Sequence, residues 1–424
     1  MEKYSKYKDS GVKWIGDIPA HWNMLRAKNM FVRMAREVRD EDNIITCFRD
    51  GQVTLRKNRR IEGFTESFKE IGYQGIRKGD LVIHQMDAFA GSIGVSDSDG
   101  KGTPVYICLQ PKDNNSNYYY AFLLREMART GFIKSLYRGI RERSSDFRYE
   151  TFAKLFLPLP PLTEQRAIVS YLDGKVGQID TYIAKQTQQI ELLKELKQAV
   201  IANAVTKGID TNPNVKRKQS GVNWLGEIPE HWEVSKLRKH FIPRIQKVSD
   251  KDYAPLSVTK DGILPQLDTA CKTDNGENRK LVRKGDYVVN SRSDRKGSGG
   301  ISPFDGSVSL INIVIYPIDG EQEYYHYLFR CNNFVEEFYR NGRGIVADLW
   351  TTRYQEMKNI EIPIPPLSEQ RAIVSYIEAK TASINKLIDA YEQQVERVKE
   401  YKQRLISDAV TGKINVTGKQ TQTN

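Results

Sequence analysis

Apolar residues recur at a 3.5-residue spacing in two stretches of the chain, residues 163–207 and 368–411. A heptad on the first stretch transfers to the second by a shift of 205 residues. The a and d residues are Ile179, Gln186, Leu193, Val200, Ile183, Ile190, Lys197 and Ala204 in the first stretch, and Ile384, Tyr391, Val398, Leu405, Ile388, Val395, Lys402 and Ala409 in the second. Six of eight positions are apolar in the first stretch and seven in the second, which predicts two long helices that pack together. The alternative is that each apolar stripe packs against its own globular domain.

Residues at the ends of the two stretches are typical of helix termini. Thr163 and Ser368 follow Pro-Pro-Leu and precede Glu, so we expect them to be N-caps. Gly208 and Gly412 are expected to follow the last helical turns. Two glycines, 174 and 177, are expected to weaken the first helix, because each costs about 1 kcal/mol relative to alanine.

The segments before each helix have the pattern of mixed α/β domains. Apolar runs at residues 81–83 and 105–109, and at 287–289 and 310–316, predict strands. Aromatic-rich amphipathic stretches follow and predict helices over residues 118–137 and 324–339.

The chain contains an internal repeat. Residues 10–22 match 220–232, residues 77–82 match 283–288, and residues 160–171 match 365–376, at offsets of 210, 206 and 205 residues. Two copies are too few for a solenoid. The Trp-x-Gly-x-Ile-Pro-x-His-Trp segment within the first match is interpreted as a hydrophobic anchor in each copy. Two equivalent units tend to pair about a pseudo-two-fold axis. Such an axis makes the helices antiparallel and places one globular domain at each end.

Composition indicates a polyanionic partner. The chain has 424 residues with a net charge of +12, and its pI is near 9.2. An excess of this size favours nucleic acid, although it could also serve solubility alone. The start lacks the apolar stretch of a signal peptide, and no apolar run is long enough to span a membrane. The cysteines Cys47, Cys108, Cys271 and Cys331 stand far apart, which indicates free thiols and a cytoplasmic location.

Motifs of catalysis are missing from the sequence. There is no phosphate-binding loop, no dinucleotide fingerprint, no Asn-Pro-Pro-Tyr motif of adenine methyltransferases and no H-x-x-x-H pair. Glu195-Leu196-Lys197 and Glu400-Tyr401-Lys402 resemble a nuclease motif but lie on the predicted helices. We therefore expect no catalytic residue and no metal site in this chain.

Basic loops where the two copies differ are the candidate DNA contacts. Arginine can bind guanine O6 and N7, and glycine allows the backbone to approach phosphate. A solvated loop with incidental charge is the alternative. The candidates are Arg56, Lys57, Arg59, Arg60, Arg138, Arg141, Arg143, Arg148, Arg292, Arg295, Lys296, Arg340, Arg343, Trp350 and Arg353.

The duplicated Trp segment and the duplicated Pro-Pro-Leu-[Thr/Ser]-Glu-Gln-Arg-Ala-Ile-Val motif resemble the specificity subunits of type I restriction–modification systems. The resemblance implies an α+β protein in which two target-recognition domains are joined by an antiparallel helical pair. We divide the chain accordingly into residues 1–158 and 211–362 (recognition domains), 159–210 and 363–414 (spacer helices), and 415–424 (a disordered tail).

The resemblance also implies the partners. They are a double-stranded DNA site in two parts, methyltransferase subunits (we expect two) that bind S-adenosylmethionine and methylate adenine N6, and a translocase/nuclease subunit, with ATP and Mg²⁺ expected on the partner subunits. The positions matching the family's helix starts are expected to dock methyltransferase subunits. They are Pro160, Pro161, Glu164, Gln165, Arg166, Pro365, Pro366, Glu369, Gln370 and Arg371.

Two other functions remain open at this point. The chain could be a protein-interaction scaffold whose positive charge is incidental, or a DNA-modifying enzyme that acts alone. The missing motifs count against the second.

Overall fold

A computed structural model of the chain describes residues 2–59, 71–136, 147–209, 215–266, 276–344 and 350–418. The chain forms two compact units. Unit 1 comprises Met1–Gln186 and Gln394–Asn424, and unit 2 comprises Thr187–Gln393. Both boundaries fall within long helices, so each unit contains one globular domain together with part of each helix.

The same sheet is built in each unit. In the described part of unit 1 it has the order β4 (Phe31–Met34), β11 (Tyr106–Pro111), β8 (Leu81–His84), β9 (Ile93–Val95). In unit 2 the order is β16 (Phe241–Pro243), β24 (Asn312–Pro317), β21 (Tyr287–Asn290), β22 (Gly299–Ile301). All neighbours are antiparallel, and the central pairs align Cys108 with Val82 and Val288 with Val314. The repeat in sequence is therefore a repeat in fold.

Smaller antiparallel pairs surround these sheets. In unit 1 they are β1 (Tyr7–Asp9) with β2 (Asp17–Pro19), β3 (Asn23–Arg26) with β12 (Phe156–Leu159), β5 (Ile45–Cys47) with β6 (Val53–Leu55), and β7 (Gln74–Ile76) with β10 (Gly100–Gly102). In unit 2 they are β13 (Arg217–Gln219) with β14 (Glu227–Pro229), β15 (Glu233–Lys236) with β25 (Glu361–Ile364), β18 (Leu256–Thr259) with β19 (Gly262–Pro265), and β20 (Arg279–Val282) between β17 (Lys247–Val248) and β23 (Gly306–Val308).

Each predicted aromatic helix is in fact two helices. Unit 1 has α2 (Asn117–Arg129) and α3 (Phe132–Ser135), separated at Gly131, whose φ of +77° is left-handed. Unit 2 has α6 (Gln322–Arg330) and α7 (Asn332–Arg340), separated at Cys331, which is extended with ψ 144°. The prediction of single helices was wrong because the apolar period continues across the break, which is two residues long in unit 1 and one residue long in unit 2. Short helices α1 (Ala27–Met30), α4 (Tyr149–Phe152) and α8 (Tyr354–Met357), and the 3₁₀ turns η1 (Arg56–Asn58), η2 (Ala88–Ala90), η3 (Leu237–Lys239) and η4 (Ser293–Arg295), complete the described elements.

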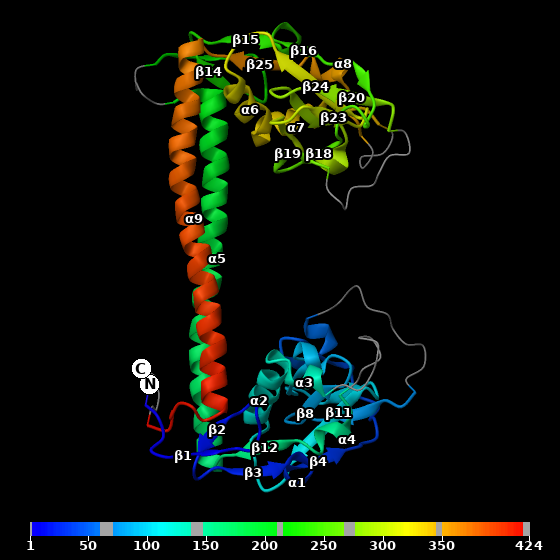
Figure 1. Ribbon diagram of the computed structural model, residues 1–424, viewed down its shortest axis with the longest axis vertical. Coiled ribbons are helices and arrows are strands. Elements are labelled where there is room, and N and C mark those ends of the chain that lie inside the picture. Colours follow the sequence, from blue (N-terminus) through cyan, green and yellow to red (C-terminus); the bar gives the residue numbers. More distant parts are fainter. Residues whose placement is uncertain are drawn as a thin grey trace. The chain divides into compact units, whose positions relative to one another are not determined.

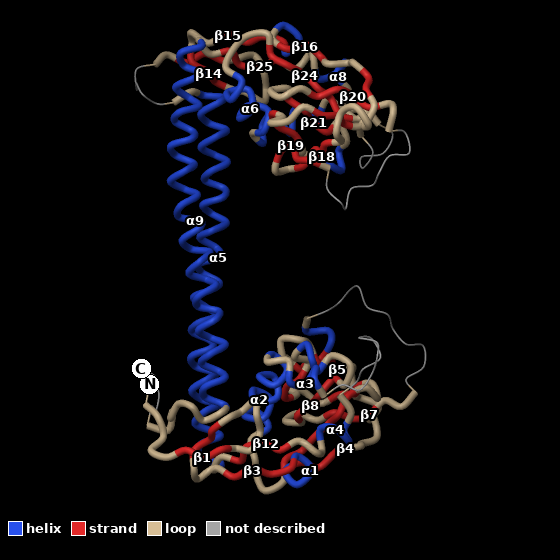
Figure 2. Tube along the Cα trace, viewed as in Figure 1, coloured by secondary structure: helices blue, strands red, loops and turns tan. Residues whose placement is uncertain are grey.

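The two long helices are α5 (Leu162–Lys207) and α9 (Leu367–Val410). Figure 2 shows each as one continuous helix, which confirms the predicted helical pair. Between residues 179 and 200 of α5, every a and d residue is buried or half-buried. All residues at the other heptad positions in this stretch are exposed except Tyr182, which is half-buried. Residues 384–398 of α9 follow the same pattern without exception. In these stretches the apolar stripes are therefore covered by the partner helix, as predicted. Nearer the helix ends the seam residues Ala204, Leu405 and Ala409 also join the cores of the globular domains, so packing against a domain contributes there.

Equivalent lysines in the seam show that the helices are antiparallel. In unit 1, Lys402 Nζ donates to Asp180 Oδ1 at 2.6 Å. In unit 2, Lys197 Nζ donates to Asn385 Oδ1 at 2.9 Å. The two bonds join positions related by the 205-residue repeat. A polar group within an apolar seam can specify the register of the helices, and these lysines are placed to do so.

The long helices begin two residues earlier than the N-cap prediction required. Thr163 and Ser368 are the second residues of α5 and α9, so they are not N-caps. In α5 the carbonyl of Pro161 accepts from Glu164 N and Gln165 N instead. The predicted glycine ends are confirmed, since Gly208 and Gly412 have φ of +79° and +74° just after the helices.

The globular domains pack onto the ends of the helix pair within each unit. Figure 1 shows α2 and α6 beside the long helices. Tyr119 of α2 donates its hydroxyl to Val410 O at 2.7 Å, and Tyr324 of α6 donates to Val205 O at 2.9 Å. Both tyrosines are fully buried. Each domain thereby satisfies a carbonyl in the last turn of a long helix, a group that has no partner within the helix itself.

Three further sequence predictions can be compared with the fold. Cys47, Cys108 and Cys331 are buried free thiols, and burial raises the pKa of Cys108 to about 12; Cys271 lies outside the described residues. The prediction of a disordered tail over residues 415–424 was wrong for its first residues. Val416 is buried in the core of unit 1, and Asn415 N donates to Glu2 O at 2.9 Å. Within the described ranges, no helix combines the length and apolarity needed to cross a membrane.

Candidate nucleic-acid interface

A carboxylate in the first turn of each long helix holds the repeated Trp segment. Glu164 accepts from Trp22 Nε1 at 2.9 Å and lies 2.6 Å from His21 Nε2. Glu369 accepts from Trp232 Nε1 at 2.8 Å and lies 2.5 Å from His231 Nε2. Both tryptophans are fully buried, so the predicted hydrophobic anchors are confirmed. The polar half of this contact was not predicted from the sequence.

Glutamines next to these carboxylates fasten the helix starts to the recognition domains. Gln165 Nε2 donates to Pro160 O at 2.9 Å, and its Oε1 accepts from Ser116 N at 2.8 Å. Gln370 Nε2 donates to Pro365 O at 2.9 Å, and its Oε1 accepts from Glu321 N at 2.7 Å. Ser116 and Glu321 are the N-cap residues of α2 and α6. Both glutamines are buried, and both ends of each amide are bonded within the unit.

The predicted docking set therefore divides into two groups. Pro160, Pro365, Gln165 and Gln370 are buried, and Glu164 and Glu369 bind inside their units. The exposed members are Pro161, Arg166, Pro366 and Arg371. Arg371 Nε lies 3.1 Å from Glu321 Oε2 at the surface. Contact with a partner subunit stays a prediction. A partner could reach these four residues and the Glu369 side chain, which is 41% exposed.

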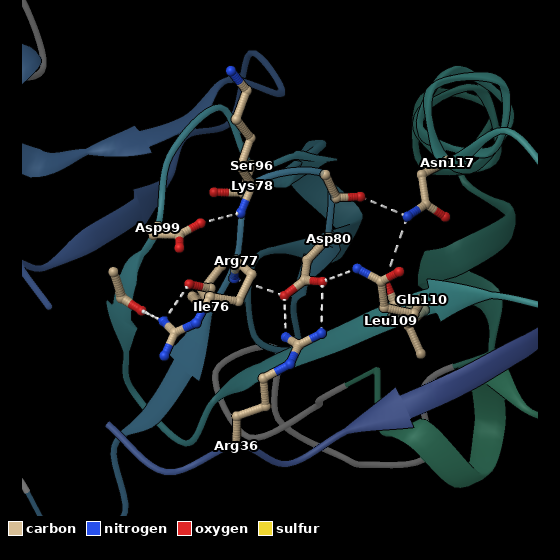
Figure 3. A network of polar contacts seen from close by, with 12 residues as sticks. Arg36, Ile76, Arg77, Lys78, Asp80, Ser96, Asp99, Leu109, Gln110 and Asn117 are labelled. Atoms are coloured by element: carbon tan, nitrogen blue, oxygen red, sulfur yellow. Dashed lines mark hydrogen bonds and ion pairs between the residues drawn. The ribbon is translucent and has the colours of Figure 1, made fainter. Parts of the chain in front are cut away.

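The repeated Arg-Lys-Gly-Asp turn is the support for the loops that follow it. In unit 1, Asp80 is fully buried and accepts from Arg36 Nη1 at 2.5 Å and Nη2 at 3.1 Å, from Arg77 N at 2.8 Å and from Gln110 Nε2 at 2.5 Å (Figure 3). A buried carboxylate needs such a set of donors to offset its lost hydration. Asp80 thus ties the start of β8 to its neighbours in the fold.

Unit 2 repeats this arrangement. Asp286 accepts from Arg244 Nε at 2.6 Å and Nη2 at 2.9 Å and from Arg283 N at 2.8 Å. The hydrogen bond to Asp286 raises the pKa of Arg244. Because β8 and β21 are fixed at their starts, the loops at their far ends, residues 84–92 and 290–298, leave from defined positions.

In unit 2 the structure brings two of the predicted DNA-contact segments together. Ser293 N donates to Trp350 O at 2.9 Å, and Thr352 N donates to Ser291 O at 2.9 Å. Isolated bridges also pair Thr351 with Arg292 and with Arg343. One surface of unit 2 therefore carries Arg292, Arg295, Lys296, Arg343 and Trp350, which the sequence analysis had assigned to separate loops.

Surface ion pairs hold most of these cations. Arg292 lies 2.9 Å from Asp294, Lys296 lies 2.6 Å from Glu336, and Arg343 lies 3.4 Å from Glu356. Arg340 pairs with Glu337 at 3.1 Å, and Arg353 is the N-cap residue of α8. Exposed pairs contribute only about 0–1 kcal/mol, so the exchange of a carboxylate for a DNA phosphate costs little.

The unit 1 candidates lie in two places. Arg56 and Lys57 are in η1, and Arg59 follows it, 2.7 Å from Asp50 and with its guanidinium 4.4 Å from the Phe48 ring centre. Arg148 precedes α4, next to Phe147, whose N–H donates to Gln85 O at 2.9 Å. Arg148 therefore lies beside the loop of residues 84–92. Arg60, Arg138, Arg141 and Arg143 lie outside the described residues.

A cleft lined by cations and carboxylates in unit 1 was not predicted from the sequence. It has a volume of about 710 Å³ between the domain and the long helices. Its lining includes Arg49, Phe89, Arg125, Arg129 and Lys402, together with Asp50, Glu126 and Asp180. Burial lowers the pKa of Arg125, and its Nε is buried without a hydrogen-bond partner among the described residues. The sequence did hold a signal, because an arginine recurs 205 residues later as Arg330. Elsewhere in the described ranges, no group of three His, Cys, Asp or Glu side chains could hold a metal ion.

Comparison with known proteins gives a consistent family. The family model described as the type I restriction modification DNA specificity domain matches residues 75–192 and 246–397, more than half of the chain. A putative type I restriction enzyme specificity subunit (MjaX) of Methanocaldococcus jannaschii is 26% identical, covering 97% of this chain and 98% of its own. The EcoBI specificity subunit of Escherichia coli is also 26% identical, over 62% of this chain and 59% of its own.

Solved structures share the fold. A chain from a study of complex assembly and conformational transition of the type I R-M system has a TM-score of 0.68 at 15% identity, covering 94% of this chain and 99% of that one. The crystal structure of the HsdS subunit from Thermoanaerobacter tengcongensis has a TM-score of 0.52 at 16% identity, covering 94% and 98%. With two matched regions of the family model on two copies of one fold, the chain belongs to the type I restriction–modification DNA specificity family, whose members recognise DNA sequence.

Proposed function

We propose that the chain recognises a double-stranded DNA site in two parts, with unit 1 reading one part and unit 2 the other. The observation that supports this most strongly is the repetition of one fold in both units, with equivalent loops at the ends of β8 and β21. Two similar recognition surfaces in one chain are suited to two half-sites. The loops differ in sequence, so the two half-sites differ as well.

The long helices set the spacing between the half-sites. Helix α5 has 46 residues and α9 has 44, which corresponds to about 69 and 66 Å of helix. Their register is supported by the seam of buried a and d residues and by the equivalent bonds of Lys197 and Lys402. A helical pair of fixed length and register has one preferred separation of its ends, so the unread spacer has one preferred length.

Partner subunits carry out the chemistry. We assign S-adenosylmethionine and adenine N6 methylation to methyltransferase subunits, and ATP, Mg²⁺ and cleavage to a translocase/nuclease subunit. Two methyltransferase subunits are expected because the exposed docking residues occur twice, as Pro161 with Arg166 and as Pro366 with Arg371. This chain then directs both reactions to its site and contributes no catalytic group.

Binding to duplexes of varied spacing tests the proposal. The chain is assembled with its methyltransferase subunit, and affinity is measured for duplexes whose half-sites are moved apart one base pair at a time. A sharp optimum at one spacing is expected, and affinity should fall steeply with salt because phosphate contacts release counterions. Binding that is indifferent to spacing would contradict the proposal. Undetectable or salt-insensitive binding would favour the interaction scaffold instead.

A further inference from the structure

The loops of residues 84–92 and 290–298 have related backbone structures, each with one 3₁₀ turn, η2 and η4. His84 N donates to Ser92 O, and Asn290 N donates to Ser298 O, both at 3.0 Å. Within the loops, Ala90 N donates to Asp87 O at 3.0 Å and Lys296 N donates to Ser293 O at 3.3 Å. These two pairs of bonds are equivalent at an offset of 206 residues. Other bonds differ, since Ser92 N donates to Asp87 O whereas Ser298 N donates to Arg295 O. Left-handed glycines follow at the same position, Gly91 with φ +91° and Gly297 with φ +78°.

The two loops also share a neighbouring segment. The segment after the aromatic helices donates to each of them, through Phe147 N to Gln85 O and through Thr352 N to Ser291 O, both at 2.9 Å. Each loop leaves a central strand that is fixed at its start by a buried aspartate. The two loops therefore occupy equivalent places in their units.

The side chains on these two related loops have opposite chemistry. At an offset of 206 residues, Met86 corresponds to Arg292 and Phe89 corresponds to Arg295. Met86 is 50% exposed and Phe89 is 37% exposed, while both arginines are exposed. Phe89 also contributes to the lining of the cleft around Arg125, and Arg49 lies 3.0 Å from Asp87 beside it. Two large apolar side chains thus lie on a loop that has cations close by.

Apolar side chains can read only apolar features of a base pair. In the major groove of DNA the apolar group on display is the C5-methyl of thymine, whereas arginine reads guanine through O6 and N7. We propose that Met86 and Phe89 contact thymine methyl groups in the half-site of unit 1, at the positions where Arg292 and Arg295 contact guanine in the half-site of unit 2. This inference rests on the proposed function and adds the residues and base chemistry that distinguish the two halves.

Base analogues test the inference directly. The complex with methyltransferase subunits is used, after the recognised sequence has been established by mapping methylated adenines in the host genome. Thymines of each half-site are replaced one at a time by deoxyuridine, which lacks only the methyl group. For the wild type, one or two replacements in the unit 1 half-site should weaken binding about three- to tenfold, as expected for the loss of a buried methyl contact.

Variants assign the effect to the loop. Met86→Ala and Phe89→Ala should weaken binding to the thymine duplex by a similar factor, and deoxyuridine at the contacted position should then cost nothing more. Val32→Ala is the matched control, because Val32 is an exposed apolar residue of unit 1 on β4, and it should bind like the wild type. Arg295→Ala tests the half-site of unit 2. Replacing guanine there by 7-deazaguanine, which lacks the N7 acceptor, should weaken binding of the wild type but not of Arg295→Ala.

The outcomes separate this inference from the proposed function. Specific binding that tolerates deoxyuridine throughout the unit 1 half-site would overturn the inference and leave the proposed function intact. An equal loss from Phe89→Ala on thymine and deoxyuridine duplexes would also overturn it, since it would indicate a side chain wedged between base pairs and not a methyl contact. Binding without sequence preference by the wild type would overturn both.

Discussion

Equivalent positions in the two copies can differ in whether the side chain is ionisable. On α2 the residue is Ala121, and at the equivalent position on α6 it is His326. Burial lowers the pKa of His326 to about 4, and the nearby Arg330 adds to this effect. Its Nδ1 accepts from Ile301 N at 3.4 Å, a contact that requires the neutral ring. His326 therefore folds into unit 2 uncharged.

Unit 2 should lose stability in acid because of this histidine. The folded pKa of about 4 lies below the unfolded value of about 6.5. The stabilisation is therefore complete above pH 6.5 and is lost as pH falls towards 4, by about 1–2 kcal/mol between pH 7 and pH 5. His326→Ala, which introduces the residue of the first copy, should reduce this loss. Urea unfolding of both proteins at the two pH values measures it, and an equal loss in both would contradict the assignment of the effect to His326.

The two long helices differ in that only α5 has glycines at two positions where α9 has alanines. Gly174 and Gly177 do not interrupt α5, and a Cβ at either position would have nothing within 4 Å. The equivalent residues of α9 are Ala379 and Ala382. The seam and the tethered helix ends thus maintain a helix that contains two residues of low helix propensity.

Alanine at these glycines should stabilise α5. Gly174→Ala and Gly177→Ala should each raise the free energy of unfolding by about 0.4–1 kcal/mol, because alanine loses less backbone entropy on folding. Thermal and urea unfolding of the full chain measure the change. The reverse substitutions Ala379→Gly and Ala382→Gly are the matched controls and should destabilise by similar amounts. Unchanged stability in all four variants would show that this part of the pair contributes nothing to the measured transition.

At the scale of the whole molecule, the two recognition units share both long helices. Helix α5 begins in unit 1 and ends in unit 2, and α9 runs in the opposite order. Each helix start is held by its own domain through Gln165 or Gln370, and each helix end is bonded by a tyrosine of the other copy's domain. A change of helix length must therefore reach both units.

A chain with longer helices should prefer a DNA site with a longer spacer. Four residues inserted after Gln188 and four after Gln393 lengthen each helix by about 6 Å, which is nearly two base-pair steps of about 3.4 Å. The preferred spacer should grow accordingly, measured by binding to the spacing series. Seven-residue insertions at the same places preserve the heptad and should shift the optimum further. An insertion in only one helix is the control, and it should impair folding and binding by breaking the register. A spacer optimum that stays the same in both double-insertion variants would contradict the role of the helices in spacing.

Periodicity and self-comparison were sufficient to predict the repeat, the two long helices, their seam and their glycine ends, since these depend on residues close in sequence or on one copy matched against the other. Contacts between distant segments were beyond such reasoning. Glu164 holds Trp22 across 142 residues, and the peptide of Ser293 meets that of Trp350 only because the domain folds them together. The burial of Gln165 and Gln370, the break at Cys331 and the cleft around Arg125 likewise follow from packing. A hydrogen bond between remote segments leaves no periodic trace along the chain, so only the three-dimensional arrangement reveals which polar residues support the fold and which remain exposed to DNA.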